Sequence, residues 1–206
     1  MNVLVIAPHP DDESIGLGGT LWLHHLRGDR VSIVYLTSGE LGLKHLPREV
    51  AWAVREAEAH RAAAVLQVAH VEFLRLPDWE VQDSIELGSG KLLPTLRQTQ
   101  PGLIYCPHAD DEHPDHAASI PLLESALHQM PAFSPRVLAY EVWTPLSRFD
   151  QVEDISECLD MKLEAIRAHE SQLAEFRYDR AAEGLAAYRG ALAGKTDFAE
   201  VFATVR

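Results

Sequence analysis

Short apolar runs alternate along this chain with longer segments in which hydrophobic residues recur at helical spacing. The apolar runs predict buried β-strands, at residues 2–7, 31–36, 71–76, 103–106 and 137–142. The helical segments lie between and after them, at residues 20–26, 48–66, 87–98, 116–129 and 158–176, with a helical tail from residue 181 that breaks at Gly194. Strands that alternate with helices predict a parallel sheet covered on both faces. We therefore expect an α/β fold, a single Rossmann-like three-layer domain with a mostly parallel sheet across residues 1–206.

The expected order of the strands indicates where a ligand would bind. In doubly wound sheets, ligands occupy the crevice beyond the carboxyl ends of the strands, at the point where the strand order reverses. With the common order 3-2-1-4-5, that crevice lies between the ends of the first and fourth strands. The residues that follow these two strands are therefore the first place to look for chemistry.

Both positions carry an unusual polar segment. Pro-His-Pro-Asp-Asp-Glu occupies residues 8–13, directly after the first strand, and Glu-His-Pro-Asp-His occupies residues 112–116, after the fourth. Each segment contains His-Pro-Asp and places a possible metal ligand three residues after a histidine, Asp12 in the first and His116 in the second. One such spacing alone is uninformative, but two related clusters at one crevice favour a metal site.

The residue types match a catalytic metal centre. Catalytic zinc sites commonly use three protein ligands of the histidine and carboxylate type and leave one position open for water. His9, Asp12 and His116 would supply this 2-His-1-carboxylate set, which can also hold Fe²⁺ or another divalent ion. Asp11 would stay free beside the site, where a carboxylate can serve as general base.

Composition disfavours several other classes of protein. Hydrophobic residues make up 47% and charged residues 24% of the chain, as in ordinary globular proteins. The 31 acidic residues outnumber the 18 basic ones, for a net charge of −13 without a basic stripe, so no nucleic-acid partner is expected. No apolar run approaches the roughly 18 residues of a membrane span, and no basic leader precedes the first strand, so we expect neither a membrane span nor a signal peptide. Having only Cys106 and Cys158, the chain is expected to be cytoplasmic, with reduced thiols.

The two polar segments also resemble the signatures of a known family. The LmbE-like (PIG-L) N-acetylglucosaminyl deacetylases carry Ala-His-Pro-Asp-Asp-Glu near the N-terminus and His-Pro-Asp-His later. Here Pro8 separates Ala7 from His9, and the second signature is intact. The likeness extends over nearly the whole chain through supporting patterns, namely Arg55-x-x-Glu58, Pro77-Asp78, Lys162-x-x-Ala165-Ile166, His169-x-Ser171-Gln172 and Phe198-Ala199-Glu200-x-Phe202. The chain is similar in particular to bacterial deacetylases of bacillithiol-type thiol synthesis, which implies a zinc-dependent hydrolase that removes acetyl from a small N-acetylglucosaminyl conjugate.

The resemblance implies a role for each signature residue. His9, Asp12 and His116 would bind Zn²⁺, and Asp11 would act as general base when water attacks the amide. His113 would stabilise the oxyanion or donate a proton. Either Asp11 or His113 would protonate the leaving amine, and the sequence does not distinguish the two.

Three further positions and the assembly complete the comparison with the family. Asp115 would orient a neighbouring imidazole, and Arg55 would bind the substrate. Some family members carry a tyrosine two residues before the second signature, where this chain has Asp111, so help from a tyrosine hydroxyl is not expected there. The resemblance also implies a homo-oligomer.

Two other functions stay open on the sequence alone. An amidase that cleaves a thiol-sugar conjugate would share both signatures. A non-catalytic nucleotide-binding Rossmann module would instead use the glycines of Gly16-x-Gly18-Gly19, but these do not match G-x-G-x-x-G, and a packing role is favoured for them. Trp79 and Trp143 are expected in the core, although sugar sites often use an aromatic platform.

Overall fold

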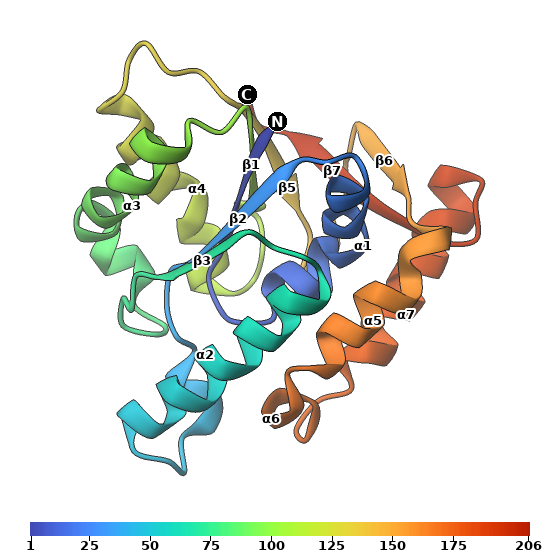
Figure 1. Cartoon of the computed structure of the whole chain (residues 1–206), viewed down its shortest axis with the longest axis horizontal. Coiled ribbons are helices and arrows are strands. Elements are labelled where there is room, and N and C mark those ends of the chain that lie inside the picture. Colours follow the sequence, from blue (N-terminus) through green and yellow to red (C-terminus); the bar gives the residue numbers. More distant parts are fainter.

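Seven β-strands form one sheet at the centre of the computed structural model, which describes residues 1–206. The strands are β1 (Asn2–Ala7), β2 (Arg30–Tyr35), β3 (His70–Phe73), β4 (Leu103–Pro107), β5 (Arg136–Tyr140), β6 (Gln151–Asp154) and β7 (Ala199–Thr204). Their order across the sheet is β3-β2-β1-β4-β5-β7-β6. Strands β1 to β5 run parallel, whereas β7 pairs antiparallel with both β5 and β6 (Figure 1). The first five strands therefore have the predicted order, and the sheet is mostly parallel.

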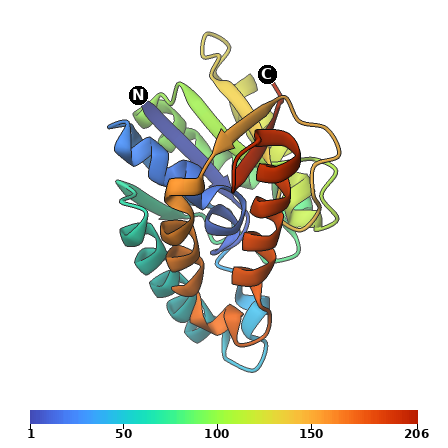
Figure 2. The same ribbon diagram turned by 90° about the vertical axis from the view of Figure 1, so that its right-hand side faces the viewer.

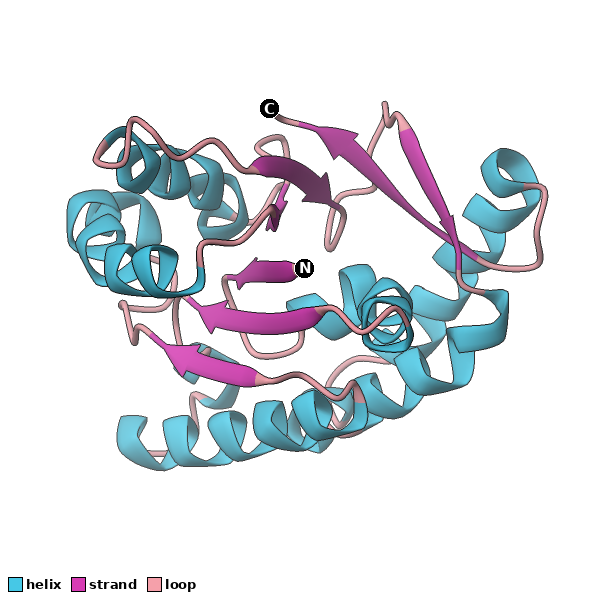
Figure 3. Ribbon diagram, turned by 45° about the horizontal axis from the view of Figure 1, so that its top comes forward, coloured by secondary structure: helices cyan, strands magenta, loops and turns pink.

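Helices cover both faces of the sheet. They are α1 (Asp12–Leu26), α2 (Arg48–Val65), α3 (Ile85–Thr99), α4 (Pro114–His128), α5 (Leu159–Arg167), α6 (Glu170–Leu173) and α7 (Tyr178–Arg189). Helices α3 and α4 pack together on one face, and α1, α2, α5 and α7 lie on the other (Figure 1). Figure 2 shows α5 and α7 side by side, and Figure 3 shows helices on both sides of the strands. The expected three-layer α/β domain is confirmed, and none of its helices combines the length and the hydropathy that crossing a membrane requires.

The core consists of two apolar layers, one on each face of the sheet, and β1 contributes to both. Val3, Val5 and Ala7 belong to the layer beneath α1 and α2, while Leu4 and Ile6 belong to the layer beneath α3 and α4. A strand buried on both faces needs a nearly continuous apolar run, which explains why this segment does not alternate. Each fully buried Val, Leu or Ile side chain contributes about 1.5–3 kcal/mol through its removal from water.

The C-terminal part of the chain differs most from the sequence prediction. The pattern predicts a helical tail from residue 181, but α7 is followed by a π-helical turn at Gly190–Gly194 and then by strand β7. The prediction is wrong for β7 because its alanines and glutamate favour helices locally, while pairing with β5 and β6 decides the structure. The pattern also misses β6, a short polar strand at the exposed edge of the sheet.

The helix predicted over residues 158–176 is broken in the structure. Helix α5 ends at Arg167 and α6 begins at Glu170, with His169 between them in a non-helical conformation. His169 is buried, and its Nε2 lies 3.7 Å from Glu13 Oε1. The break thus follows from a tertiary placement of the histidine, which hydrophobic periodicity does not encode.

Helix α1 positions the site and is longer than predicted. The pattern places its start at residue 20, whereas the helix begins at Asp12 and is kinked at Leu17. The glycines that indicate a loop lie inside the helix instead, at close packing contacts. A Cβ on Gly16, for example, would come 2.4 Å from the ring of Tyr140. The packing role of these glycines is confirmed, and they form no phosphate-binding loop.

Candidate active site

The two signature segments meet beyond the carboxyl ends of β1 and β4, which are neighbouring strands. The first segment runs from β1 into the first turn of α1, and the second runs into α4. His113 is the N-cap of α4 and Pro114 follows in its first turn, where the N–H that proline lacks has no helical partner. This topology brings His9 and His116, 107 residues apart in the chain, into contact.

The three predicted ligand residues converge on one point. His9 Nδ1, Asp12 Oδ2 and His116 Nε2 each lie 3.3 Å from the other two atoms. All three side chains are buried. The backbone N–H of His9 also donates to Asp12 Oδ2, at 2.8 Å, and so fixes the carboxylate between the rings. We call these three residues the ligand triangle.

The ligand triangle fits a divalent metal ion. With metal–ligand bonds of about 2.0–2.1 Å, the ligand atoms of a tetrahedral site lie about 3.3–3.4 Å apart. Imidazole nitrogens combined with a carboxylate oxygen suit Zn²⁺ or Fe²⁺. Two imidazole nitrogens that face each other at 3.3 Å need a proton or a cation between them, since their lone pairs repel. Spacing and donor chemistry therefore agree with a three-ligand site that keeps one position open.

Two carboxylates orient His9 from the side opposite the ligand triangle. Its Nε2 lies 3.1 Å from Asp115 Oδ2 and 3.1 Å from Asp78 Oδ1. Asp115 accepts in turn from the backbone N–H groups of Trp79 and Val81, at 2.8 and 3.1 Å. A proton held on Nε2 leaves Nδ1 free for a metal ion, as is usual for metal-bound histidines. The structure thus places Asp115 against an imidazole of the other signature and adds Asp78, to which the sequence assigns no role.

Asp111 lies at ion-pair distance from the other nitrogen of His116. His116 Nδ1 lies 3.2 Å from Asp111 Oδ1, and its Nε2 faces the other ligands. Asp111 also accepts from the backbone N–H groups of His113 at 2.9 Å and of Trp143 and Thr144 at 3.1 Å. Asp111, the position at which no tyrosine hydroxyl is expected, therefore lies beside a predicted ligand and fixes the loop after β5.

The electrostatics of the ligand triangle favour positive charge. Burial lowers the pKa of His116, but the carboxylates of Asp12 and Asp111 outweigh burial and raise that pKa to about 9. Burial raises the pKa of Asp12, yet His116 and His9 stabilise its carboxylate and hold the pKa well below its usual range. A field that retains a proton on a buried imidazole also attracts a metal cation.

Asp11 lies next to the ligand triangle in a strained backbone conformation. Its φ of 131° is rarely adopted by residues with a side chain, and such strain is common at functional sites. Arg55 Nη2 donates to Asp11 Oδ2 at 3.0 Å. Burial raises the pKa of Asp11 to about 6, although Arg55 opposes the shift. A buried carboxylate with a raised pKa has the properties of a general base.

His113 packs against both ligand imidazoles, with ring centres 4.6 Å from His9 and 4.7 Å from His116. One nitrogen of each of the three rings lies within 4.8 Å of the others. The backbone N–H of Asp115 donates to His113 Nδ1 at 3.3 Å, so the neutral ring carries its proton on Nε2. Burial and the two neighbouring imidazoles lower the pKa of His113 to about 4. At neutral pH this side chain is an uncharged hydrogen-bond donor.

A cavity of about 270 Å³ exposes these groups, and we call it the catalytic cavity. Trp79 and Trp143 line it and are 52% and 55% exposed, so their predicted place in the core is wrong. Their ring centres lie 4.5 and 6.1 Å from that of His113. Both residues follow the ends of strands, where they border the site instead of the interior of the sheet.

Arg55 is more enclosed than a substrate-binding residue at a surface. Its Nη1 donates to the carbonyl oxygen of Gly39 at 2.8 Å, and Nη2 donates to that of Pro10 at 2.5 Å as well as to Asp11. Its Nε has no hydrogen-bond partner, and the side chain lines the catalytic cavity. Arg55 thus holds together the loops around Asp11, and its contact with substrate stays a prediction.

Sequence reasoning assigns no site role to several residues that line the catalytic cavity. They come from loops and from the C-terminal segment, namely Lys44, Asp78, Gln172, Phe176 and Tyr178. Asp78 and Gln172 belong to the supporting patterns Pro77-Asp78 and His169-x-Ser171-Gln172, so a signal for them is present in the sequence. Phe176 and Tyr178 carry no such signal, because only the turn before α7 brings them to the cavity.

Comparison with known proteins agrees with this geometry. The PIG-L family, described as GlcNAc-PI de-N-acetylase, matches residues 4–127, which contain both signatures. Diacetylchitobiose deacetylase of Thermococcus kodakarensis is 30% identical over 84% of this chain and 70% of its own length. A probable N-acetyl-alpha-D-glucosaminyl L-malate deacetylase 2 of Bacillus subtilis is 30% identical over 83% of both proteins. The crystal structure of the conserved protein TT1542 from Thermus thermophilus superimposes with a TM-score of 0.87 at 31% identity, covering 99% of this chain and 94% of that one. With this match in sequence and in fold, the chain belongs to the PIG-L family.

Proposed function

We propose that this chain is a metal-dependent hydrolase that removes the acetyl group from an N-acetylglucosaminyl conjugate. The observation that carries the proposal is the ligand triangle beside Asp11, a buried carboxylate that the triangle does not use. A metal site with a purely structural role would not need this additional carboxylate. Relatives named as deacetylases of N-acetylglucosamine compounds support the same reaction.

In the proposed reaction, the metal ion, Asp11 and His113 each have a separate role. A divalent ion in the ligand triangle, Zn²⁺ in our proposal, would supply the Lewis acidity that polarises the amide carbonyl and acidifies water. Asp11 takes a proton from the water as its oxygen adds to the carbonyl carbon. His113 donates from Nε2 to the oxyanion that develops. Asp11 then returns the proton to the nitrogen while the C–N bond breaks, which releases acetate and the free amine.

Two further residues position the groups that react. Asp115 orients the His9 imidazole, because its carboxylate fixes which ring nitrogen faces the ligand triangle. Arg55 is proposed to contact the substrate through its unpartnered Nε while it holds Asp11 in place. Both are positioned by backbone contacts, so the geometry exists before the substrate binds.

The substrate is proposed to be a small conjugate of the kind used in bacillithiol-type thiol synthesis. The Bacillus subtilis relative, named as an N-acetylglucosaminyl malate deacetylase, supports this choice. Lys44 and Gln172 offer polar groups for sugar hydroxyls, and Trp79 and Trp143 offer apolar rings at the edge of the cavity. We further propose that the enzyme works in the cytoplasm as a homo-oligomer.

A second candidate function is that of an amidase acting on a thiol-sugar conjugate. The amidase reaction uses the same amide chemistry and differs only in the acyl group that is transferred to water. The observation that favours it is a second, largely apolar cavity, which shares Ile15, Trp143 and Tyr178 with the catalytic cavity. An acyl group larger than acetyl would find room there.

The proposed function is tested by product analysis on protein of known metal content. Purified protein loaded with Zn²⁺ is incubated with N-acetylglucosaminyl malate and with diacetylchitobiose, and the released amine and acetate are both quantified. We expect equal amounts of the two products and no other cleavage. A failure to release amine from any N-acetylglucosaminyl compound, or full turnover by protein verified to be free of metal, would contradict the proposal.

A further inference from the structure

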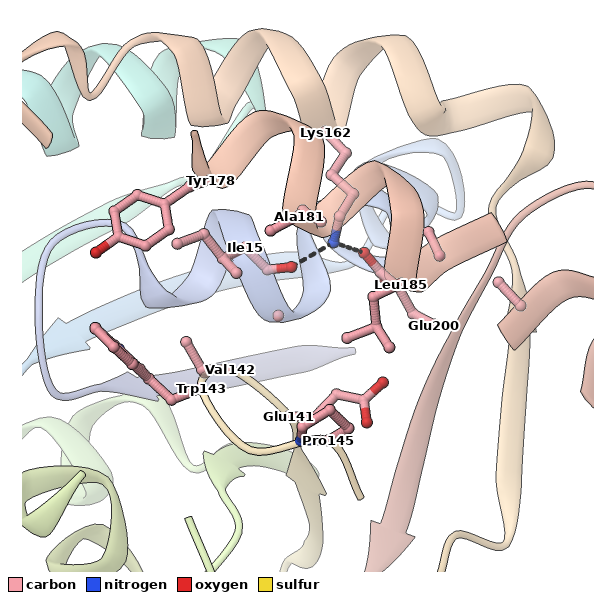
Figure 4. A pocket seen from close by; sticks show the side chains of 14 residues that line it. Ile15, Glu141, Val142, Trp143, Pro145, Lys162, Tyr178, Ala181, Leu185 and Glu200 are labelled. Atoms are coloured by element: carbon pink, nitrogen blue, oxygen red, sulfur yellow. Dashed lines mark hydrogen bonds and ion pairs between the residues drawn. The ribbon is translucent and has the colours of Figure 1, made fainter. Parts of the chain in front are cut away.

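The second cavity adjoins the catalytic cavity at Ile15, Trp143 and Tyr178, and we call it the side chamber. Its volume is about 310 Å³, within the range of cavities that bind small organic ligands. Most of its lining is apolar, including Val142, Pro145 and Leu185. Figure 4 shows Tyr178 and Trp143 at one end of this space, with Leu185 at the other. A cavity of this size with a mostly apolar lining suits an apolar occupant.

The charged groups in the wall of the side chamber are already paired. Lys162 Nζ donates to Glu200 Oε1 at 2.5 Å and to the carbonyl oxygen of Ile15 at 2.6 Å (Figure 4). Arg189 donates to both carboxylate oxygens of Glu141, at 3.1 and 2.6 Å. A polar ligand would have to compete with these contacts, whereas an apolar ligand leaves them intact. The side chamber therefore disfavours the binding of charged ligands.

The side chamber adjoins the catalytic cavity, which holds the reacting groups. Ile15 lines both cavities, and it follows Asp11 by one helical turn, since its N–H donates to the carbonyl oxygen of Asp11 at 2.9 Å. Trp143 and Tyr178 complete the shared wall. A group attached to the reacting carbonyl carbon would therefore reach the side chamber by passing the side chains of these three residues.

Another part of the lining of the catalytic cavity is polar and offers a place for the sugar. There the loop that contains Gly42 packs against Arg55 and Gln172, as a Cβ on Gly42 would come 2.7 Å from Arg55 Nη1 and 2.8 Å from Gln172 Oε1. A sugar has hydroxyls to satisfy and suits this wall. The scissile amide then points its nitrogen towards the polar wall and its acyl group towards the side chamber.

On the basis of the proposed function, we propose that the side chamber is an acyl-binding subsite. It would admit a linear acyl chain longer than acetyl on the glucosamine nitrogen. The reaction is unchanged: water adds to the carbonyl, the C–N bond breaks, and a fatty carboxylate and the free amine leave. Because burial of each methylene is favourable, kcat/KM should rise about three- to fourfold for each carbon added, until the chamber is full.

The test compares acyl length with a variant that fills the side chamber. Methyl glycosides of N-acetyl-, N-butyryl- and N-hexanoylglucosamine are assayed for amine release by Zn²⁺-loaded protein. Ala181→Phe places a ring in the chamber from an exposed position of α7, and Ala187→Phe, on the same helix but lining neither cavity, is the matched control. Retained turnover of the acetyl substrate shows that each variant is folded.

We expect the wild type and Ala187→Phe to hydrolyse the butyryl substrate with a kcat/KM about tenfold above that of the acetyl substrate. Ala181→Phe should keep acetyl hydrolysis within about twofold and lose the gain for longer chains. Hydrolysis of the acetyl substrate with a kcat/KM that falls as the chain lengthens would overturn the acyl subsite alone. Failure to hydrolyse any N-acyl compound would overturn the proposed function and the subsite with it.

A second measurement separates the subsite from catalytic turnover. Hexanoate, the product of the longest substrate, should inhibit acetyl hydrolysis at a concentration at least tenfold below that of acetate. Ala181→Phe should abolish this difference, while Ala187→Phe should retain it. Equal inhibition by hexanoate and acetate in the wild type would overturn the acyl subsite.

Discussion

Helix α1 contacts buried carboxylates in two places, Asp11 and Asp12 at its start and Glu200 of β7 near its kink, and these two clusters are built in opposite ways. At its first turn, Asp11 and Asp12 line the catalytic cavity and face imidazole and guanidinium groups. At its kink, Glu200 accepts hydrogen bonds from two successive backbone N–H groups of the helix, at 3.0 and 2.7 Å, and from Lys162. The kink frees those N–H groups, and Glu200 caps them.

The difference between the clusters lies in how completely each carboxylate is satisfied. Both oxygens of Glu200 have donors, its charge is balanced by Lys162, and the assembly is saturated. Asp12 Oδ2 faces two imidazole nitrogens at 3.3 Å, a spacing that suits a cation between them, and Asp11 has a strained backbone. We therefore assign chemistry to the cluster of Asp11 and Asp12, where hydrogen bonding is incomplete and the backbone is strained. The cluster of Glu200 and Lys162, where every oxygen has a donor, stabilises the fold.

Removing a metal ligand should have the largest effect, and it should be confined to the first cluster. Asp12→Ala and His116→Ala each delete one of only three proposed protein ligands, so bound metal should fall strongly and amine release should fall to background. Dialysis of the wild type against a chelator should abolish turnover, and added Zn²⁺ should restore it. Metal content by elemental analysis is measured on the same preparations. Full metal occupancy in both variants would contradict the ligand assignment.

Asp11→Asn should separate catalysis from metal binding. The three proposed ligands stay in place, so the metal should be retained, while kcat should fall about 10²–10⁴-fold because the proposed general base is lost. A base works only when deprotonated, so wild-type activity should decline as the pH falls through the pKa of Asp11. Burial raises that pKa to about 6, and a bound cation would lower it. The acidic limb of the kcat/KM profile should therefore flatten in Asp11→Asn.

The control for Asp11→Asn is its neighbour, Asp12→Asn, which has the same change of charge. Asp12→Asn should lose metal together with activity. If Asp11→Asn loses the metal while Asp12→Asn keeps it, the two roles are exchanged. Metal content and kcat must be determined together to distinguish these results.

Lys162→Met should affect the second cluster and leave the first intact. The substitution leaves the buried carboxylate of Glu200 without a cationic partner, which lowers the free energy of unfolding by about 3–5 kcal/mol. Metal content should be unchanged. The double variant Lys162→Met/Glu200→Gln should recover part of the lost stability, since no charge remains unpaired. Urea denaturation measures both effects, and a loss of metal at unchanged stability would show that the two clusters are not independent.

The sequence predicts the sheet and the ligand triangle for the same reason. Buried parallel strands have a strong local pattern, and the topology of such sheets fixes where their carboxyl ends meet. His9 and Asp12 come just after β1, and His116 comes after the loop that follows β4, so adjacency in the fold can be inferred from the order of the strands. The start of α1 at Asp12 could not be inferred, because glycines that pack closely against Tyr140 look the same in sequence as glycines of a loop.

Other parts of the molecule depend on contacts between distant segments and leave no local pattern. Strand β7 mixes residues that favour helices with residues that favour strands, and its pairing with β5 and β6 decides its conformation. Asp78 and Tyr178 reach the site only through the placement of the β3 and α7 loops, and the side chamber exists only where α1, α7 and the loop after β5 meet. Such features require the three-dimensional structure, even where a supporting pattern such as Pro77-Asp78 hints at a role.

Arg55 shares properties with both clusters, and its substitution should have the smallest of the effects predicted here. It is a buried cation with partners, like Lys162, yet its Nε is unpartnered and it lines the catalytic cavity, like Asp11. Arg55→Ala removes a hydrogen bond to a charged group, about 1.5–3 kcal/mol, so kcat should fall about ten- to hundredfold. Because Arg55 lowers the pKa of Asp11, its loss should also move the acidic limb to higher pH. A raised KM at unchanged kcat and an unshifted limb would instead make Arg55 a substrate-binding residue with no part in positioning Asp11.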